Sequence, residues 1–229
     1  MKRKDLEFSK KYDAEHAKAY FEKHQSGLWR KISNWRDQQI CRQALKIAGN
    51  PNSILDMPCG TGRFWPLLAE KKNRAIIAAD YSQEMIDIGM AYRPYEITQK
   101  IQTLQTSAFD LTMNDNSVDC VFCIRLLHHI GTSEDRMKIL DELHRVTRQS
   151  VIISLWVDGN YKAWRRKKLE RKRTNQSYQN RFVLPVEMVE KEFENSGFII
   201  KKHIDFIPKY AMWRTYVLSK DHAFISKSS

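Results

Sequence analysis

Short apolar runs alternate with segments of helical periodicity through the middle of the chain. Three segments repeat their apolar positions at spacings of three to four, which predicts helices over residues 63–72, 83–92 and 134–147. Five apolar runs predict strands, at residues 53–57, 75–80, 101–105, 118–124 and 150–156. Strands that alternate with helices of this length pair in parallel through right-handed crossovers, so the pattern predicts a doubly wound α/β fold.

Both ends of the chain depart from this alternation. Residues 1–50 have helical spacing, and Gly27 is expected to divide them into two helices. Near the other end a helix is predicted over residues 185–197, starting at a proline and ending at a glycine. Two β-like runs follow at residues 198–207 and 210–220. Because so short a connection joins them, an antiparallel hairpin is expected.

Length and composition suit one compact domain. The 229 residues are 42% hydrophobic, and charged residues are mixed along most of the chain. No apolar segment approaches the roughly 20 residues of a membrane span and no secretory signal is present, so a cytoplasmic location is expected. Cys120 and Cys123 form a CxxC inside an apolar run, where burial as small hydrophobic residues is the favoured interpretation. No metal site is expected.

The chain is strongly basic, with 39 Lys and Arg against 27 acids and a formal charge of +12. Such a charge favours anionic partners such as nucleic acid, phospholipid or a phosphorylated metabolite. Basic residues are densest between Lys162 and Arg173, with Trp164 and Tyr178 nearby, and an inserted helix and loop is predicted over residues 158–184. Three interpretations of this insertion stay open: a solvated helix face, a segment that covers the substrate site and selects an anionic acceptor, or a nucleic-acid-binding surface.

A glycine-rich loop follows the first apolar run. The segment SILDMPCGTGRF places Asp56 at a strand end, Gly60 and Gly62 one residue apart, and a helix start after them. Glycines let the backbone turn sharply beside a ligand, and a helix N-terminus offers free N–H groups, although plain packing also explains such pairs. The next strand ends in Asp80, where dinucleotide-type folds hold an acid that binds ribose. Together these features predict a nucleotide-type cofactor, and the missing third glycine argues against NAD or FAD.

An ordered set of motifs over residues 53–156 resembles the class I S-adenosylmethionine-dependent methyltransferases, in particular their ubiquinone/menaquinone-type small-molecule group. SILDMPCGTGRF is similar to the first motif, AADYSQEM to the second, and TSAFDL and VDCVFCIRLLHHI to the third and fourth. The resemblance implies a Rossmann-like sheet of about seven strands. It also implies S-adenosylmethionine as cofactor and S-adenosylhomocysteine as product.

The resemblance assigns cofactor contacts residue by residue. The loop from Cys59 to Gly62 would flank the methionine part, while Asp56 would order that loop or bind the cofactor's amino group. Asp80 would bind the ribose hydroxyls. The further contacts implied are Tyr81, Met85 and Phe109 along the adenine, Asp110 accepting from its exocyclic amine, and Arg125 bordering both cofactor and substrate. Pro58 stands where the family often has glycine, so this position has no N–H to donate to the cofactor.

The family resemblance extends to the N-terminus, where residues 1–50 would form a helical lid over the cofactor-binding core of residues 51–157. Candidates within the lid are Tyr12, Tyr20, Arg30 and Lys31. Arg30 is the preferred group for the methionine carboxylate, because its planar fork binds both oxygens. The basic insertion and a C-terminal helix and hairpin over residues 185–220 would complete a single domain.

The acceptor end is predicted from two adjacent histidines after the fourth strand. His129 is the candidate catalytic residue, since a histidine at this edge can take a proton from an attacking hydroxyl or amine; His128 is the weaker candidate. The predicted function is methyl transfer to an oxygen or nitrogen of a small molecule, with an anionic acceptor favoured by the charge. An RNA methyltransferase and an inactive cofactor-binding protein are the alternatives. The sequence IRLLHH, in place of an Asn-Pro-Pro-Tyr-like tetrapeptide, argues against methylation of base amines.

Overall fold

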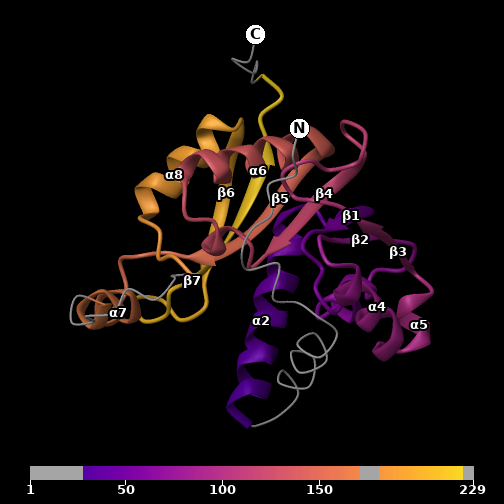
Figure 1. Cartoon of the computed structure of the whole chain (residues 1–229), viewed down its shortest axis with the longest axis horizontal. Helices are drawn as coiled ribbons and strands as arrows, with labels where there is room; N and C mark the ends of the chain where they lie inside the picture. The colour runs from indigo at the N-terminus through magenta and orange to yellow at the C-terminus, as the bar shows by residue number, and fades with distance from the viewer. Residues whose placement is uncertain (1–27, 171–180, 224–229) are drawn as a thin grey trace.

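One mixed β-sheet organises the chain (Figure 1), for which a computed structural model describes residues 28–170 and 181–223. The strands follow the spatial order β3-β2-β1-β4-β5-β7-β6. Their bounds are β1 (Ser53–Asp56), β2 (Ala75–Asp80), β3 (Ile101–Gln105), β4 (Val118–Ile124), β5 (Thr147–Trp156), β6 (Phe198–Asp205) and β7 (Trp213–Lys220). The first five strands pair in parallel, whereas β7 pairs antiparallel with both β5 and β6. The predicted doubly wound Rossmann-like sheet with its terminal hairpin is confirmed.

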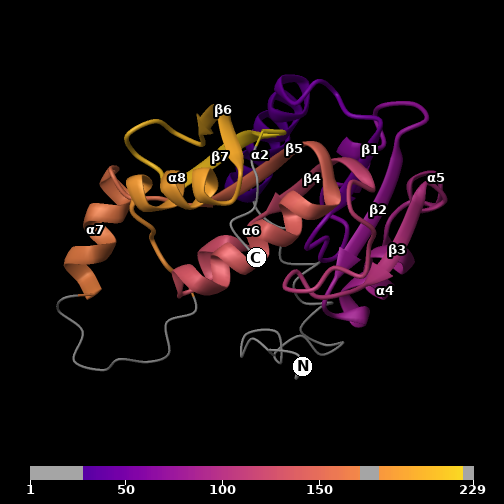
Figure 2. The same cartoon turned by 90° about the horizontal axis from the view of Figure 1, so that it is seen from above.

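Helices cover both faces of the sheet, because the central strands bury alternate side chains on opposite sides. Ile54, Phe122 and Ile152 point to the face covered by α2, α3 and α4, whereas Leu55 and Val121 point to the face covered by α6 and α8. Figure 2 shows α2 and α6 on opposite sides of the central strands. The helices are α2 (Leu28–Ile47), α3 (Trp65–Leu68), α4 (Gln83–Tyr92), α5 (Tyr95–Thr98), α6 (Ser133–Val146), α7 (Tyr161–Glu170) and α8 (Val186–Asn195), with a short 3-10 helix η2 (Leu127–His129).

The helix after the glycine-rich loop is much shorter than predicted. It was expected over residues 63–72, but α3 ends at Leu68. The buried Arg74 guanidinium donates to the Leu68 carbonyl at 2.8 Å and to the Pro51 carbonyl at 3.0 Å, which satisfies a helix end. Asn73 then reverses the chain with φ +62. The tertiary partners of Arg74 therefore decide where this helix stops.

Other local predictions agree more closely with the structure. The helices α4, α6 and α8 lie where periodicity predicted them, and α2 is helical from Leu28, the first described residue, to Ile47. The helix predicted before Gly27 lies outside the described residues. Cys120 and Cys123 are fully buried, as expected for small apolar side chains. Within the described part of the chain, no helix is long and apolar enough to cross a membrane.

Gly62 offers a test of how the loop after β1 is built. It has φ +67, and a Cβ added there would lie 2.4 Å from the buried Trp65 ring. Gly62→Ala should therefore lower the free energy of unfolding by roughly 2–4 kcal/mol, through left-handed strain plus overpacking. Gly49, with φ +80 and no atom near an added Cβ, is the matched control, and Gly49→Ala should cost only about 1 kcal/mol. Equal losses in urea unfolding would contradict the packing role.

Candidate active site

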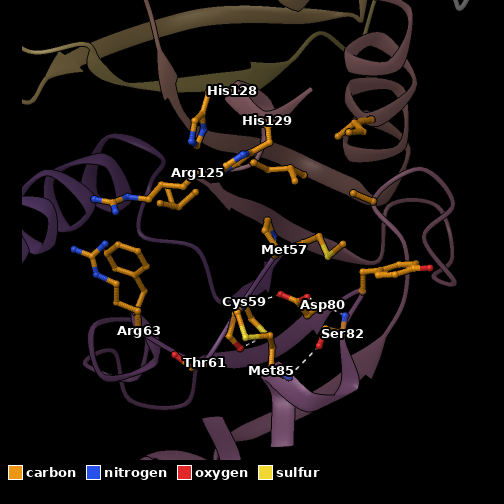
Figure 3. A pocket seen from close by; sticks show the side chains of 18 of the residues that line it. Met57, Cys59, Thr61, Arg63, Asp80, Ser82, Met85, Arg125, His128 and His129 are labelled. Carbon is orange, nitrogen blue, oxygen red and sulfur yellow. Dashed lines mark hydrogen bonds between the residues drawn. The ribbon is translucent and has the colours of Figure 1, made fainter. Parts of the chain in front are cut away.

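A pocket of about 540 Å³ opens at the carboxyl ends of the parallel strands. Its walls come from the segments after β1, β2, β3 and β4, from α2, and from Arg181 and Trp213. Ligands bind at this edge in open α/β sheets, because the loops there diverge at the switch in strand order. Figure 3 shows Asp80, Ser82 and Met85 gathered at one end, with Arg125, His128 and His129 at the other.

Two backbone amides bind the Asp80 carboxyl group at the first end of the pocket. The Gly60 N–H donates to Oδ2 at 2.8 Å, and the Ser82 N–H donates to Oδ1 at 3.0 Å. Gly60 has φ +53, and a Cβ added there would meet open space. The loop backbone therefore faces the pocket with no side chain in the way, while Asp80 ties the loop to the end of β2.

Apolar and aromatic residues form the wall beside Asp80. Tyr81, Met85 and Phe109 all line this end, together with Ser107 and Ala108. Ser82 caps α4 by accepting from the Met85 N–H at 3.2 Å, which fixes Met85 against the pocket. This wall suits a flat heterocycle. Asp80, at the end of β2, lies beside it and could accept hydrogen bonds from the hydroxyls of a ribose.

Three residues that the sequence assigned to the cofactor lie outside the pocket lining. Asp110 is exposed, whereas Ser107, three residues earlier, borders the pocket. The reason is a tight turn in which the Asp110 N–H donates to the Ser107 carbonyl at 3.1 Å and Thr106 Oγ1 donates to the Asp110 carbonyl. Gly62 packs on Trp65 instead of facing the cavity, and Asp56 is buried beneath the loop.

Burial raises the pKa values of the two acids near the glycine-rich loop, Asp56 and Asp80. It raises the pKa of Asp56 well above its usual range, and the nearby Asp80 adds to this rise. Burial also raises the pKa of Asp80, although the amides of Ser82 and Gly60 oppose it by favouring the charged form. Asp56 Oδ2 has no hydrogen-bond partner among the described residues. These two acids therefore form a region that a cationic group, such as an ammonium, would stabilise.

The opposite end of the pocket is rich in arginine. Arg30, Arg63, Arg125 and Arg181 line the pocket, against Asp80 as the single acid among the described residues of that lining. Asp37 of α2 lies behind them: its Oδ2 accepts from Nη2 of Arg63 and from Nη2 of Arg125, each at 2.5 Å. One carboxylate thus fixes two guanidinium groups. Among the described residues of the lining, arginines therefore outnumber acids.

Arg125 is fixed by the fold as well as by its ion pair. It directly follows β4 with φ +66, unusual for a residue with a side chain, and its N–H donates to the Ser154 hydroxyl at 3.1 Å. Its guanidinium carbon lies 4.6 Å from the ring centre of Trp213. A strained backbone, a hydrogen bond and a cation–π contact together hold this side chain at the pocket.

The two histidines have different surroundings. His128 is buried, with its ring centre 5.1 Å from Trp156 and 4.8 Å from Trp213. Burial lowers its pKa well below the usual range, with further contributions from His129, Arg181 and Arg125. Its ring is therefore neutral at physiological pH. His129 is half-buried and also lines the pocket.

The remaining N-terminal candidates are only partly described. Arg30 borders the pocket, whereas Lys31 is exposed and does not. Tyr12, Tyr20 and Tyr178 lie outside the described residues. Sequence reasoning missed several lining residues, among them Asn34, Arg63, Ser107, Arg181 and Trp213. Arg63 directly follows the glycine pair and Ser107 lies within the TSAFDL motif, so their positions were the available signals, whereas Asn34, Arg181 and Trp213 come from segments outside the motifs.

The pocket fits S-adenosylmethionine in its chemistry. The open loop backbone, the acid at the β2 end and the flat apolar wall match an adenosine. Its volume lies within the usual range for small-molecule sites.

Residues 55–155 match the family described as a methyltransferase domain. Over these residues, a little less than half of the chain, the protein is similar to S-adenosylmethionine-dependent methyltransferases, and the comparisons support S-adenosylmethionine as the cofactor. The enzyme class predicted from the motifs is thereby confirmed.

Several proteins resemble the chain. Mouse tRNA (carboxymethyluridine(34)-5-O)-methyltransferase ALKBH8 is 29% identical over 135 residues, covering 58% of this chain and 19% of that protein. Lactococcus lactis demethylmenaquinone methyltransferase is 31% identical over 98 residues, covering 42% and 38%. The chain thus spans about a fifth of the mouse relative's length. In fold it resembles magnesium protoporphyrin IX methyltransferase from Synechocystis PCC 6803, with a TM-score of 0.68, 15% identity, and coverage of 86% and 89%.

Substitutions of Asp80, which lines the pocket, and of Asp110, which does not, test the cofactor site. Asp80→Asn should weaken S-adenosylmethionine binding about 10- to 100-fold, because a charge-assisted hydrogen bond and the tie to Gly60 are both weakened. Asp110→Asn is the matched control and should leave the dissociation constant unchanged, since Asp110 lies outside the lining. Isothermal titration calorimetry measures both. Weaker binding by the Asp110 variant alone would restore the assignment made from sequence.

Proposed function

We propose that this protein methylates an oxygen of an anionic acceptor group, and that the acceptor is a carboxylate. The single observation that carries the proposal is the arginine-rich end of the pocket, where Asp37 fixes Arg63 and Arg125. The bound cofactor supplies an electrophilic methyl group on a positively charged sulfur. A carboxylate oxygen would form the new bond to that carbon while the carbon–sulfur bond breaks and sulfur keeps the electron pair.

The position of the arginines supports an acceptor role. The adenosine-type wall lies beside β2 and β3, and the glycine-rich loop follows β1. The next strands across the sheet are β4 and β5, followed by β7. Arg125 directly follows β4 and Trp213 begins β7, so both stand beyond the cofactor half of the pocket. An acceptor entering from that side meets guanidinium groups first.

Arg63 provides a specific contact for an anion. Its Nε donates to Asn34 Oδ1 at 2.9 Å and its Nη2 pairs with Asp37, whereas its buried Nη1 has no acceptor among the described residues. An unpaired buried donor is costly, so a ligand oxygen that reached this nitrogen, after a shift of the groups that now cover it, would be stabilised. Asp37 and Asn34 act as positioning residues, since they hold the guanidinium fork without occupying all of its donors.

The charge of this end favours a carboxylate over other nucleophiles. An amine is protonated at neutral pH, so it lacks a free electron pair and is repelled by the arginines. A hydroxyl would have to lose a proton to a base. A carboxylate is already ionised, and needs only orientation and shielding from water. His129 remains a predicted acceptor contact, and this chemistry does not require it as a base.

A second candidate is the same reaction on an acceptor carried by RNA. The mouse relative is named for a carboxymethyluridine in tRNA, and a Bos taurus relative, 21% identical over 128 residues, is named a probable tRNA methyltransferase. The observation that favours this candidate here is the basic helix α7 beside the acceptor end. Small-molecule and RNA acceptors both fit a carboxylate site.

The chemistry of the product tests the proposal. The enzyme would be incubated with S-adenosylmethionine tritiated in its methyl group and with carboxylate, phenol and amine acceptors, both small molecules and tRNA. Carboxyl methyl esters release volatile methanol in alkali, whereas methyl ethers and methylamines do not. We expect the transferred label to become volatile in alkali. Label that stays bound under these conditions would refute a carboxylate acceptor.

The arginine pair tests how the acceptor is bound. Arg63→Lys and Arg125→Lys should each raise the acceptor KM about 10- to 100-fold, because a single ammonium cannot replace the planar fork. Binding of S-adenosylmethionine should change little. The control is Arg42→Lys, since Arg42 pairs with Glu70 on the exposed side of α2. A loss of cofactor affinity with an unchanged acceptor KM would assign the arginines to the cofactor instead.

A further inference from the structure

Helix α7 presents aromatic rings to solvent among basic side chains. Tyr161 and Trp164 lie one turn apart on α7, and Tyr210 belongs to the connection between β6 and β7. Their exposed fractions are 48%, 59% and 44%. Large rings grouped at the surface mark sites where a partner covers them. We call these residues, with the neighbouring cations, the α7 patch: Tyr161, Lys162, Trp164, Arg165, Lys168 and Tyr210.

The rings of the α7 patch pack against one another, and ammonium groups lie over two of them. The rings of Tyr161 and Tyr210 are nearly parallel, 11° apart with centres 5.7 Å apart, and Trp164 lies 5.9 Å from Tyr161. The Lys162 ammonium is 5.1 Å from the Tyr210 ring centre, and the Lys168 ammonium is 5.3 Å from that of Trp164. Flat rings with ammonium groups around them match the two parts of a nucleotide, its base and its phosphate.

Backbone hydrogen bonds hold the α7 patch in shape. The N–H groups of Tyr161 and Lys162 donate to the carbonyls of Lys209 and Tyr210, at 2.9 and 3.0 Å. The side chain of Asn160 accepts from the Ala163 N–H at 3.0 Å, which caps the start of the helix. Two segments distant in sequence are therefore fixed together. The rings do not have to be ordered when a ligand binds, which lowers the entropic cost.

The α7 patch lies beside the acceptor end of the pocket. On the inner side of α7, Arg166 donates to the Arg181 carbonyl at 3.2 Å, and its guanidinium carbon lies 5.1 Å from the Trp156 ring centre. Arg181 lines the pocket, and Trp156 packs on His128. These side chains connect the patch to the pocket. Figure 1 shows α7 at the side of the molecule away from α4 and α5.

We infer that the α7 patch binds single-stranded RNA that carries the methyl acceptor. Unpaired bases stack on Tyr161, Trp164 and Tyr210, and phosphates lie against Lys162, Arg165 and Lys168. The inference rests on the proposed function in one respect, namely that the acceptor group reaches the arginine-rich end. A membrane surface fits less well, because α7 lacks the continuous apolar face that an interfacial helix needs. The formal charge of +12 attracts a polyanion of any length.

A direct measurement of RNA binding, without methyl transfer, tests the inference. The probe is a fluorescein-labelled, unstructured RNA of about 12 nucleotides, within the usual range of site sizes, and its anisotropy is measured against the full-length protein. Trp164→Ala and Tyr210→Ala should each lower the affinity about 5- to 50-fold, whereas Trp164→Phe should retain most of it. Arg165→Ala together with Lys168→Ala should reduce the salt dependence of binding, by about 0.7 in the logarithmic slope for each phosphate that these side chains neutralise in the wild type.

Matched controls separate this surface from general charge and from misfolding. Trp35→Ala removes another strongly exposed tryptophan, on α2, and should leave RNA affinity unchanged. All variants should keep their thermal midpoint and their affinity for S-adenosylmethionine. Duplex RNA of the same sequence should bind more weakly than the single strand, because its bases are not free to stack.

Three results would overturn the inference. One is equal RNA affinity of the Trp164→Ala and Tyr210→Ala variants and the wild type. Another is equal binding of duplex and single strand. The third is binding to phosphatidylserine vesicles, lost in these variants, with no RNA binding. Each result leaves the proposed function testable. If the enzyme methylates a small carboxylate, with a label that is volatile in alkali, but does not bind RNA, the carboxylate acceptor stands and only the RNA inference fails.

Discussion

The hydrogen bond from the Gly60 amide to the Asp80 carboxyl joins the loop after β1 to the end of β2, and the cofactor half of the pocket depends on it. Parallel pairing brings the carboxyl ends of β1 and β2 to the same edge of the sheet, so the loop and the acid meet there. Beneath the loop, the absence of a side chain at Gly62 lets the Trp65 ring pack directly under it. The loop is thus held from the side by a hydrogen bond and from below by an aromatic ring.

A different interaction organises the acceptor half. Several guanidinium groups facing one cavity would repel each other and separate if nothing held them. The half-buried Asp37 carboxylate of α2 accepts from two of them and so fixes their relative position. A single acid offsets only part of the positive charge. This half of the pocket is therefore ordered and cationic at once, which is the combination that anion binding requires.

The two halves come from different parts of the chain. Apart from Arg63, which belongs to the arginine-rich end, the residues lining the pocket between positions 57 and 109 form the cofactor half, on consecutive strand-to-helix turns of the parallel sheet. The acceptor half combines α2, the segment after β4, Arg181 and Trp213, which are far apart in sequence. Helix α7 is attached beside this second half through Arg166 and Arg181.

The sequence by itself determined the strands, most helices, the parallel core with its antiparallel hairpin, and the cofactor class. The elements follow from apolar periodicity, and the glycine pair with the acid at the next strand end indicated a nucleotide-type cofactor, which the resemblance of the motifs to methyltransferases implied to be S-adenosylmethionine. The tertiary structure alone decided that Ser107 and not Asp110 borders the pocket, since a turn of four residues rotates one side chain in and the other out. It also decided the early end of α3, through the partners of Arg74. The acceptor half was out of reach from sequence because its contacts are non-local: Asp37 and Arg125 are 88 positions apart, and only the packing of α2 on the sheet brings them together.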